Sequence, residues 1–99
     1  MITVDASRAA ERKVAMFRKA VGDYINTKAT LEGFDSIVTA VTYADEPADP
    51  VNQLKGVALR EWRSLCWEHC RNELGVWEST GVEPVVEDLI AGLPMLTIP

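Results

Sequence analysis

The chain of 99 residues has few groups with distinctive chemistry: two cysteines, one histidine and no long run of apolar residues. Since about 18 consecutive apolar residues are needed to cross a membrane, the sequence predicts no membrane contact. Cys66 and Cys70 are four residues apart in an expected helix, so a bridge between them would close almost no loop and would add little stability. Residues 1–5 lack the basic and apolar regions of a signal peptide. We therefore expect an intracellular protein with reduced cysteines.

Enzyme motifs are missing as well. The sequence contains no GxGxxG, GxxxxGK[ST], HExxH or GxSxG pattern. A cysteine could pair with His69, but nucleophilic catalysis also needs an oxyanion hole, and side chains on one helix face point outward in parallel. Acidic residues at 45–49 and 87–88 lie in segments expected to be exposed, where carboxylates keep ordinary pKa values and do not act as general acids at neutral pH. We predict neither enzymatic activity nor a cofactor.

Basic residues are fewer than acidic ones, which gives a net charge of -5 and argues against nucleic-acid binding. The charge is uneven along the chain. Residues 1–30 carry six Lys and Arg against three acids, whereas residues 31–50 carry five acids and no base, and residues 76–99 four acids and no base. This division suggests charge pairing within the chain or head-to-tail contacts between subunits, although a mixed solvated surface is the simplest explanation.

A first long helix is predicted over about residues 6–32. Its apolar stripe advances in helical steps through Ala6, Ala10, Val14, Phe17, Val21, Tyr24 and Leu31. Gly33 is placed to end this helix in a left-handed conformation, with Phe34 folding back on the last turn. The spacing also fits a short coiled coil, so a homo-oligomer formed through this N-terminal helix is an alternative to packing within the monomer.

Proline and glycine divide the rest of the chain. Pro50 and Gly75 bound a second long helix, and Pro84 and Gly92 bound a short one, because proline suits the first turn of a helix and glycine its end. The predicted fold is a single all-α domain, 1–99: two long antiparallel helices (about 6–32 and 51–74), two short helices (about 36–43 and 85–91) and an extended apolar C-terminal tail. The core face of the second long helix is expected to hold Leu54, Ala58, Leu59, Trp62, Leu65, Cys66 and His69.

Cys66, His69 and Cys70 form the sharpest chemical cluster, since offsets of three and four place them on one helical face. Cysteine and histidine are zinc ligands, and a fourth ligand would have to be a carboxylate, water or another subunit. Cysteine is, however, among the most buried residue types, and ligands from one helix alone rarely close a tetrahedral site. We expect a packing role and no metal site.

Trp67 supports the main functional hypothesis. If its helix buries the side of Trp62, Trp67 points well away from that side. Arg63, Trp67 and Arg71 are spaced by four, so two guanidinium groups can flank one indole, and Trp and Arg are enriched at binding hot spots. The pattern predicts a docking face for another protein, unless the first helix or the tail covers Trp67. The apolar tail adds the candidate protein-binding residues Leu93, Met95, Leu96 and Ile98.

Three stretches resemble a known group of proteins. Residues Gly33–Ala44 (GFDSIVTAVTYA) and Ala58–Trp67 (ALREWRSLCW) resemble two consecutive segments of small tail-associated proteins of tailed bacteriophages and prophages. The ending Val82–Pro94, with its Leu-Ile and Leu-Pro pairs, is similar to the close of those proteins. Together the matches span about residues 24–94, and the departure lies at Cys66–Cys70, where the tail proteins are expected to be more aliphatic or aromatic.

The resemblance implies a non-enzymatic structural or adaptor component at the tail tip, the baseplate or the tail-fibre attachment. Its implied partners are other phage tail or fibre proteins, and its implied location is the virion tail, with the host cytoplasm during assembly. No binding residues follow from the resemblance. An assembly chaperone for tail or fibre proteins, absent from the mature virion, is the alternative. A nucleic-acid contact through Arg8, Arg12 and Lys19 fits poorly with the overall acidity.

Overall fold

The computed structural model describes the backbone from Val4 to Pro99 and side chains from Arg8 onward. Its elements, in chain order, are α1 (Val4–Leu31), α2 (Ile37–Thr42), the 3-10 turn η1 (Tyr43–Asp45), α3 (Pro50–Thr80) and α4 (Val86–Ala91). Residues 4–99 contain no strand. The predicted all-α fold, with two long and two short helices, is therefore confirmed.

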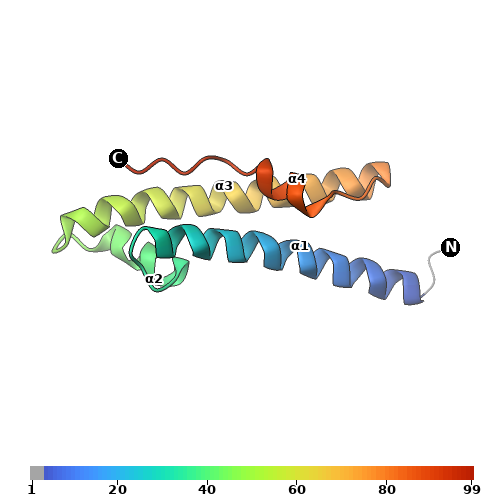
Figure 1. Ribbon diagram of the computed structural model, residues 1–99, viewed down its shortest axis with the longest axis horizontal. Coiled ribbons are helices and arrows are strands. Elements are labelled where there is room, and N and C mark those ends of the chain that lie inside the picture. Colours follow the sequence, from blue (N-terminus) through green and yellow to red (C-terminus); the bar gives the residue numbers. More distant parts are fainter. Residues whose placement is uncertain (1–3) are drawn as a thin grey trace.

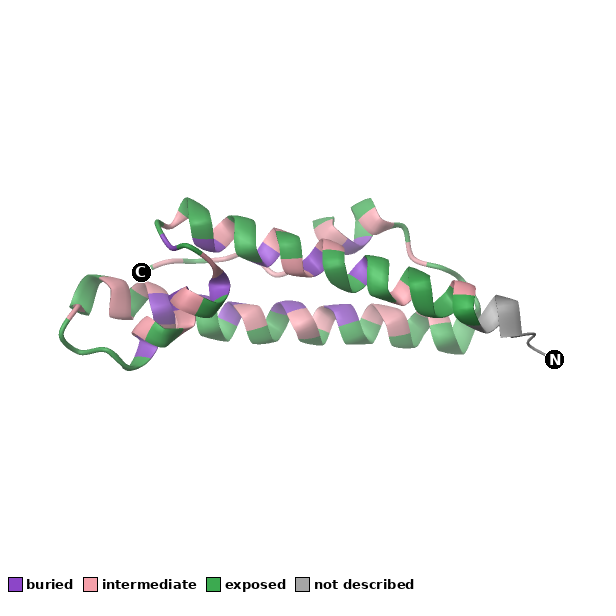
Figure 2. Cartoon of the chain, turned by 90° about the horizontal axis from the view of Figure 1, so that it is seen from below, coloured by how far each residue is buried: buried purple, intermediate pink, exposed green. Residues whose placement is uncertain are grey.

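The two long helices, α1 and α3, run antiparallel along the long axis of a molecule measuring 57 × 21 × 19 Å (Figure 1). The segment of α2 and η1 closes one end of this pair. After α3 the chain turns back through α4, and the C-terminal tail runs along α3 toward the α2 end. The buried positions concentrate between the two long helices, whereas the outer surfaces are exposed (Figure 2).

The turn after α1 forms as its residues predict. Gly33 has a φ of +98°, and the Phe34 amide donates a hydrogen bond of 3.2 Å to the Ala29 carbonyl, which returns Phe34 to the last turn of the helix. Ser36 then caps α2, because its hydroxyl oxygen accepts a hydrogen bond of 3.2 Å from the Thr39 amide. These local signals direct the chain from α1 into α2 within a few residues.

The second long helix begins as predicted but ends later. Asp49 caps α3 by accepting from the Asn52 amide at 3.1 Å, and Pro50 occupies the first turn. The prediction that Gly75 closes the helix is wrong: α3 continues to Thr80, and Gly81, with a φ of +76°, is the residue that ends it. Glycine inside a helix costs about 1 kcal/mol, whereas burying a large apolar side chain gains roughly 1.5–3 kcal/mol.

Part of that gain comes from Trp77, which lies beyond Gly75 and is half-buried. Its ring meets Phe17 of α1 edge to face, with the ring centroids 6.0 Å apart and the planes at 86°. Ending the helix at Leu74 would remove Trp77 from this contact. This tertiary contact, which no local signal reveals, thus favours a helix that ends at Thr80 and not at Leu74.

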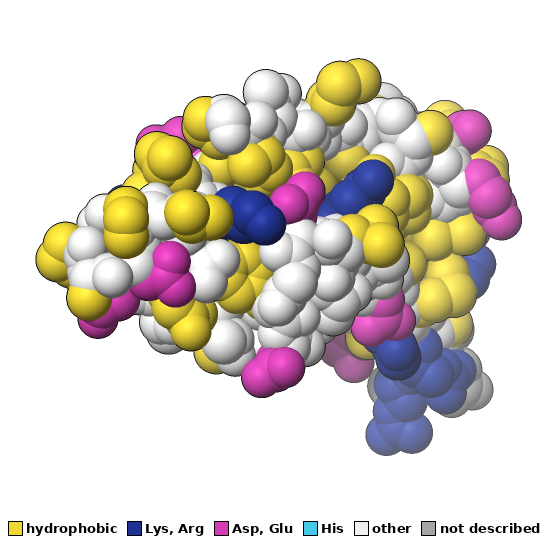
Figure 3. Space-filling view, turned by 60° about the vertical axis from the view of Figure 1, so that its left-hand side comes forward, with side chains coloured by type: hydrophobic (Ala, Val, Ile, Leu, Met, Phe, Trp, Pro, Cys, Tyr) yellow, Lys and Arg dark blue, Asp and Glu magenta, His cyan; other side chains and the backbone are white. Residues whose placement is uncertain are grey.

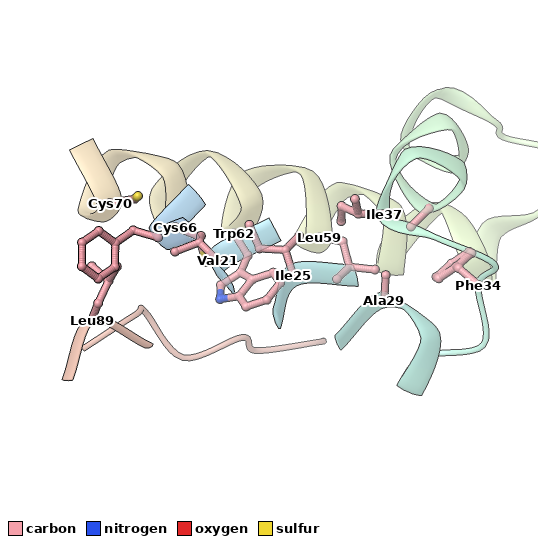
Figure 4. Packing of buried hydrophobic residues seen from close by; sticks show 12 residues of the cluster. Val21, Ile25, Ala29, Phe34, Ile37, Leu59, Trp62, Cys66, Cys70 and Leu89 are labelled. Atoms are coloured by element: carbon pink, nitrogen blue, oxygen red, sulfur yellow. The ribbon is translucent and has the colours of Figure 1, made fainter. Parts of the chain in front are cut away.

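The core is a single layer between the long helices. Its α1 members recur every four residues (Phe17, Val21, Ile25, Ala29), and its α3 members are Leu59, Trp62, Cys66 and Cys70, with Leu89 added from α4 (Figure 4). Two residues expected on the core face of α3, Leu54 and Leu65, are instead 57% and 52% exposed. Leu31, expected in the stripe of α1, is also exposed, because Ala29 takes the core position in that turn.

Gly56 sets how closely α3 crosses the α2–η1 segment. A Cβ atom at this position would lie 2.6 Å from the Ala44 amide nitrogen and 2.8 Å from the Ala40 carbonyl oxygen. Both distances are shorter than nonbonded atoms allow, so only glycine fits where the backbones touch. This contact fixes the end of the molecule at which α2 and η1 pack on α3.

Candidate functional site

The residues of the docking hypothesis lie together on α3. Arg63, Ser64, Trp67 and Arg71 line one surface hollow of about 400 Å³. Four-residue spacing on a helix places them on one face, as the sequence predicts. Arg63 is half-buried and Arg71 is exposed, so the two guanidinium groups border the hollow without being enclosed in the core.

Trp67 is more covered than its position in the sequence suggests. The prediction that it points well away from the buried side is wrong: the side chain is half-buried and packs against the core cluster. Its ring atoms Cη2 and Cζ2 lie 3.8 Å from the point that a Cβ of Gly22 would occupy. The absence of a side chain at Gly22 therefore lets the indole rest against α1, while the rest of the ring borders the hollow.

A second hollow, of about 590 Å³, adjoins the first because Arg71 lines both. It lies between the first half of α1 and the last turns of α3, and its lining residues are Ala10, Val14, Arg18, Arg71, Leu74, Gly75, Trp77 and Glu78. Leu74 and Trp77 are half-buried against the core cluster. We name the surface formed by Arg18, Arg63, Trp67, Arg71, Leu74 and Trp77 the arginine seam.

Arg18 brings a third cation to this surface from the facing helix. Arg18 and Arg71 both act on the buried thiol of Cys70: burial raises its pKa, and the two positive charges nearby lower it in part. Sequence analysis missed Arg18, because only the packing of α1 on α3 shows which side of α1 faces the seam. Arg18 precedes Gly22 by four residues, which is about one helical turn, and this spacing is the sequence signal that could have identified it.

Among residues 8–99, the arginines of the arginine seam have no carboxylate partner. The ion pairs among residues 8–99 join Lys13 to Glu83, Lys19 to Asp23, Lys55 to Glu32 and Arg60 to Asp45. No carboxylate of that part of the chain lies within 4.0 Å of Arg18, Arg63 or Arg71. The only cation–π contact in the same range joins Lys28 to Tyr24, so the two guanidinium groups of α3 flank Trp67 without stacking on it.

The seam differs from the basic residues at the start of α1. Arg8, Arg12 and Lys13 are exposed in the first described turns, and Figure 3 shows Lys and Arg side chains gathered at the distant N-terminal end of α1. Neither seam hollow is lined by these three residues. They provide a matched set of cations on the same helix but outside the seam.

The side chains of Cys66 and Cys70 lie in different surroundings from that of His69. Both cysteines are free and fully buried in the core, and burial raises the pKa of the Cys66 thiol to about 11. The ring of His69 lies at α4, with Nε2 3.2 Å from the Leu89 carbonyl oxygen. Within the described part of the chain no three Cys, His, Asp or Glu side chains are grouped as a metal ion requires.

The C-terminal tail, which sequence analysis offered as a docking segment, binds the molecule's own helices. The Trp62 indole Nε1 donates a hydrogen bond of 2.7 Å to the Pro94 carbonyl, and Figure 4 shows that nitrogen directed toward the tail. Leu93, Leu96 and Ile98 are half-buried against the core cluster, whereas Met95 is 89% exposed. In an extended segment alternate side chains face opposite ways, so Leu96 and Ile98 face inward and Met95 faces outward. Leu93 lies in the bend directly after α4 and also faces the core.

Hollows flank the tail on both sides. One, of about 950 Å³, lies between the tail, α4 and the last turns of α1, and includes Tyr24, Lys28 and Ile90 in its lining. The other, of about 420 Å³, lies between the tail and α3, where Leu54, Leu65 and Met95 contribute exposed apolar surface. Among the described helices, none is long and apolar enough to span a membrane.

Comparisons with known proteins add nothing to this geometry. No protein-family model, no curated protein and no solved structure matches the chain.

Proposed function

We propose that this protein is a non-enzymatic structural or adaptor component of a bacteriophage tail, which docks on larger tail or fibre proteins. The resemblance of residues 24–94 to small tail-associated proteins provides the context. In this proposal the protein resides in the virion tail, at the tip, the baseplate or the fibre attachment, and in the host cytoplasm during assembly.

The observation that carries the docking role is the exposed side of Trp67 between Arg63 and Arg71. Side chains of Trp and Arg dominate binding hot spots because they combine a large apolar area with directed hydrogen bonds. Here a half-buried indole packs against α1 and borders a hollow whose two arginines have no carboxylate within 4.0 Å among residues 8–99. An anchor that already packs against its own molecule loses less side-chain entropy when a partner covers it, which favours binding.

Mass spectrometry of purified particles tests the proposal directly. A tail component must be present in stoichiometric ratio to known tail proteins after the particles have been purified to constant composition. A matched preparation in which Arg63 and Arg71 are replaced by Gln should show a reduced amount of the protein in particles. Presence in the infected cell but complete absence from particles contradicts a structural role.

The same measurement separates the second candidate, an assembly chaperone for tail or fibre proteins that is absent from the mature virion. The exposed apolar side chains Leu54, Leu65 and Met95 beside the tail favour this candidate, because a chaperone must cover apolar surface of a client until assembly. A chaperone should co-purify with an unassembled tail or fibre protein and leave it when the tail is complete.

A further inference from the structure

The three arginines of the arginine seam form no ion pair with a carboxylate among residues 8–99. Arg18 and Arg71 line one hollow, and Arg63 and Arg71 line the next, so two like charges from different helices border the same space. Like charges in close proximity repel unless an anion lies between them. Glu78 lies on the rim of the larger hollow, yet it is within 4.0 Å of neither guanidinium in the described residues.

Two neighbouring cations on the same helices do have carboxylate partners. Arg60, one turn before Ser64 on α3, lies 3.5 Å from Asp45, and Lys19, next to Arg18 on α1, lies 2.7 Å from Asp23. Although the chain has a net charge of -5, no carboxylate among residues 8–99 lies within 4.0 Å of the three arginines on this surface. Arginine presents a planar fork of N–H donors that fits a carboxylate in bidentate geometry.

The shape of the seam fits a helix. The apolar floor of its larger hollow is formed by two facing helices, with Val14 on α1 and Leu74 and Trp77 on α3. An amphipathic helix fills such a groove with its apolar face and keeps its charged positions at the rims. Arg63 and Arg71 are eight residues apart on α3, or about 12 Å along the axis, which corresponds to acidic side chains seven or eight residues apart on a bound helix.

We infer that the arginine seam binds an amphipathic helix of another protein, whose Asp or Glu side chains pair with Arg18, Arg63 and Arg71. Apolar side chains of that helix cover the exposed parts of Trp67, Leu74 and Trp77. The inference rests on the proposed docking role and specifies the chemistry of the partner at that site. A phosphate backbone is the less suitable anion, because a chain with net charge -5 repels nucleic acid outside the seam.

A selection from a displayed library of helical peptides tests the inference with the full chain as bait. The enriched helices should carry Asp or Glu seven or eight residues apart, flanked by apolar residues. One enriched peptide is then synthesised, together with a version in which its acids are Gln. We expect the Gln version to bind on the order of tenfold more weakly, and the binding of the acidic peptide to weaken at high salt.

Variants of the bait locate the binding. Arg18→Gln combined with Arg71→Gln should weaken the acidic peptide on the order of tenfold, since both charge-assisted contacts are lost. Arg8→Gln combined with Arg12→Gln changes the net charge equally but lies outside the seam, and should leave the affinity unchanged. Circular dichroism verifies that both double variants keep the helical content of the parent chain.

Several results would overturn the inference. One is a selection in which no helical peptide is enriched, or in which the enriched peptides carry no excess of Asp and Glu. Another is equal affinity of the acidic peptide for the two double variants. A single-stranded oligonucleotide that displaces the peptide would assign the seam to nucleic acid. A shift from oligomer to monomer caused only by Arg18→Gln and Arg71→Gln would assign it to a second copy of this chain. The selection needs no phage particle, so it can succeed when the particle analysis fails. The particle analysis can likewise succeed when the selection fails, so the two proposals are tested separately.

Discussion

Trp62 holds the C-terminal tail in place through Pro94. The indole Nε1 donates a hydrogen bond of 2.7 Å to the Pro94 carbonyl, although the two residues are 32 positions apart in the chain. Trp62 is at the same time a core residue that contacts Tyr24 of α1, with the ring centroids 6.1 Å apart. The position of the tail is thus coupled to the packing of the two long helices.

Replacing Trp62 by Phe should release the C-terminal tail while the helices remain folded. A phenyl ring still fills part of the core position, but the hydrogen bond to Pro94 is lost, which costs about 1 kcal/mol, and the smaller ring adds the cost of a small cavity. Urea unfolding should show a modest decrease in stability, and chymotrypsin should cut after Leu96 faster than in the parent chain. Met95→Ala is the control, because this side chain is 89% exposed and should affect neither measurement. An unchanged cleavage rate would mean that the apolar contacts alone retain the tail.

Gly56→Ala should be strongly destabilising. The added Cβ would lie 2.6 Å from the Ala44 amide nitrogen, so the α2–η1 segment must move away from α3. Overpacking of this kind costs roughly 1–3 kcal/mol, and backbone atoms yield less readily than side chains. Thermal unfolding measures the effect. Gly75→Ala is the matched control, since nothing lies within 4 Å of its Cβ and the helical residue should gain up to about 1 kcal/mol.

The two faces of α3 should respond differently to truncation. Leu59 is fully buried, so Leu59→Ala should cost about 2–5 kcal/mol through the lost contacts and the cavity. Leu65, which is 52% exposed, should cost less than about 1 kcal/mol when changed to Ala. Denaturant unfolding of both variants checks the placement of the core face. Similar losses for the two would show that Leu65 is packed in solution.

Stability should fall at alkaline pH because of the buried cysteines. The pKa of Cys66 is raised from 9.0 to about 11 in the folded chain, so between these values the unfolded state releases a proton that the folded state retains. The free energy of unfolding therefore decreases as pH rises from 9 to 11, by about 2 kcal/mol for this thiol, and burial raises the pKa of Cys70 as well. Urea midpoints across this range measure the effect.

Replacement of Cys66 by Ala supplies the control for that pH dependence. The variant loses packing at every pH, but its stability should decline less between pH 9 and 11 than that of the parent chain. An identical decline in both proteins would show that another group causes the alkaline loss. Alkylation by iodoacetamide should likewise be slow in the native state and fast in urea, since only a thiolate reacts.

Trp67→Ala should lower stability and weaken docking, because the indole serves both purposes. One edge packs on α1 at Gly22, so we expect a loss of about 1–3 kcal/mol with the helical circular dichroism retained. Incorporation into phage particles should decrease more than for a variant of equal stability, and Leu59→Val provides that reference. Full incorporation of Trp67→Ala would exclude the indole as a docking anchor.

Local signals in the sequence determined much of this molecule. The all-α fold, the left-handed Gly33, the Ser36 cap and Pro50 at the start of α3 each depend on residues within one or two turns. Backbone geometry and capping are short-range effects, so the residues that cause them are adjacent in the chain. The grouping of Arg63, Trp67 and Arg71 on one face also follows from helical spacing alone.

Tertiary packing decided the rest. The contact of Trp77 with Phe17 carries α3 past Gly75, and the rotation of α3 against α1 exposes Leu54 and Leu65 while it covers part of Trp67. The same packing brings Arg18 to the seam and holds the tail through Pro94. Helical periodicity shows which residues share one face of a helix. Which of those residues contact the neighbouring helix depends on how the side chains of the two helices interlock, and the sequence of a single helix does not determine this.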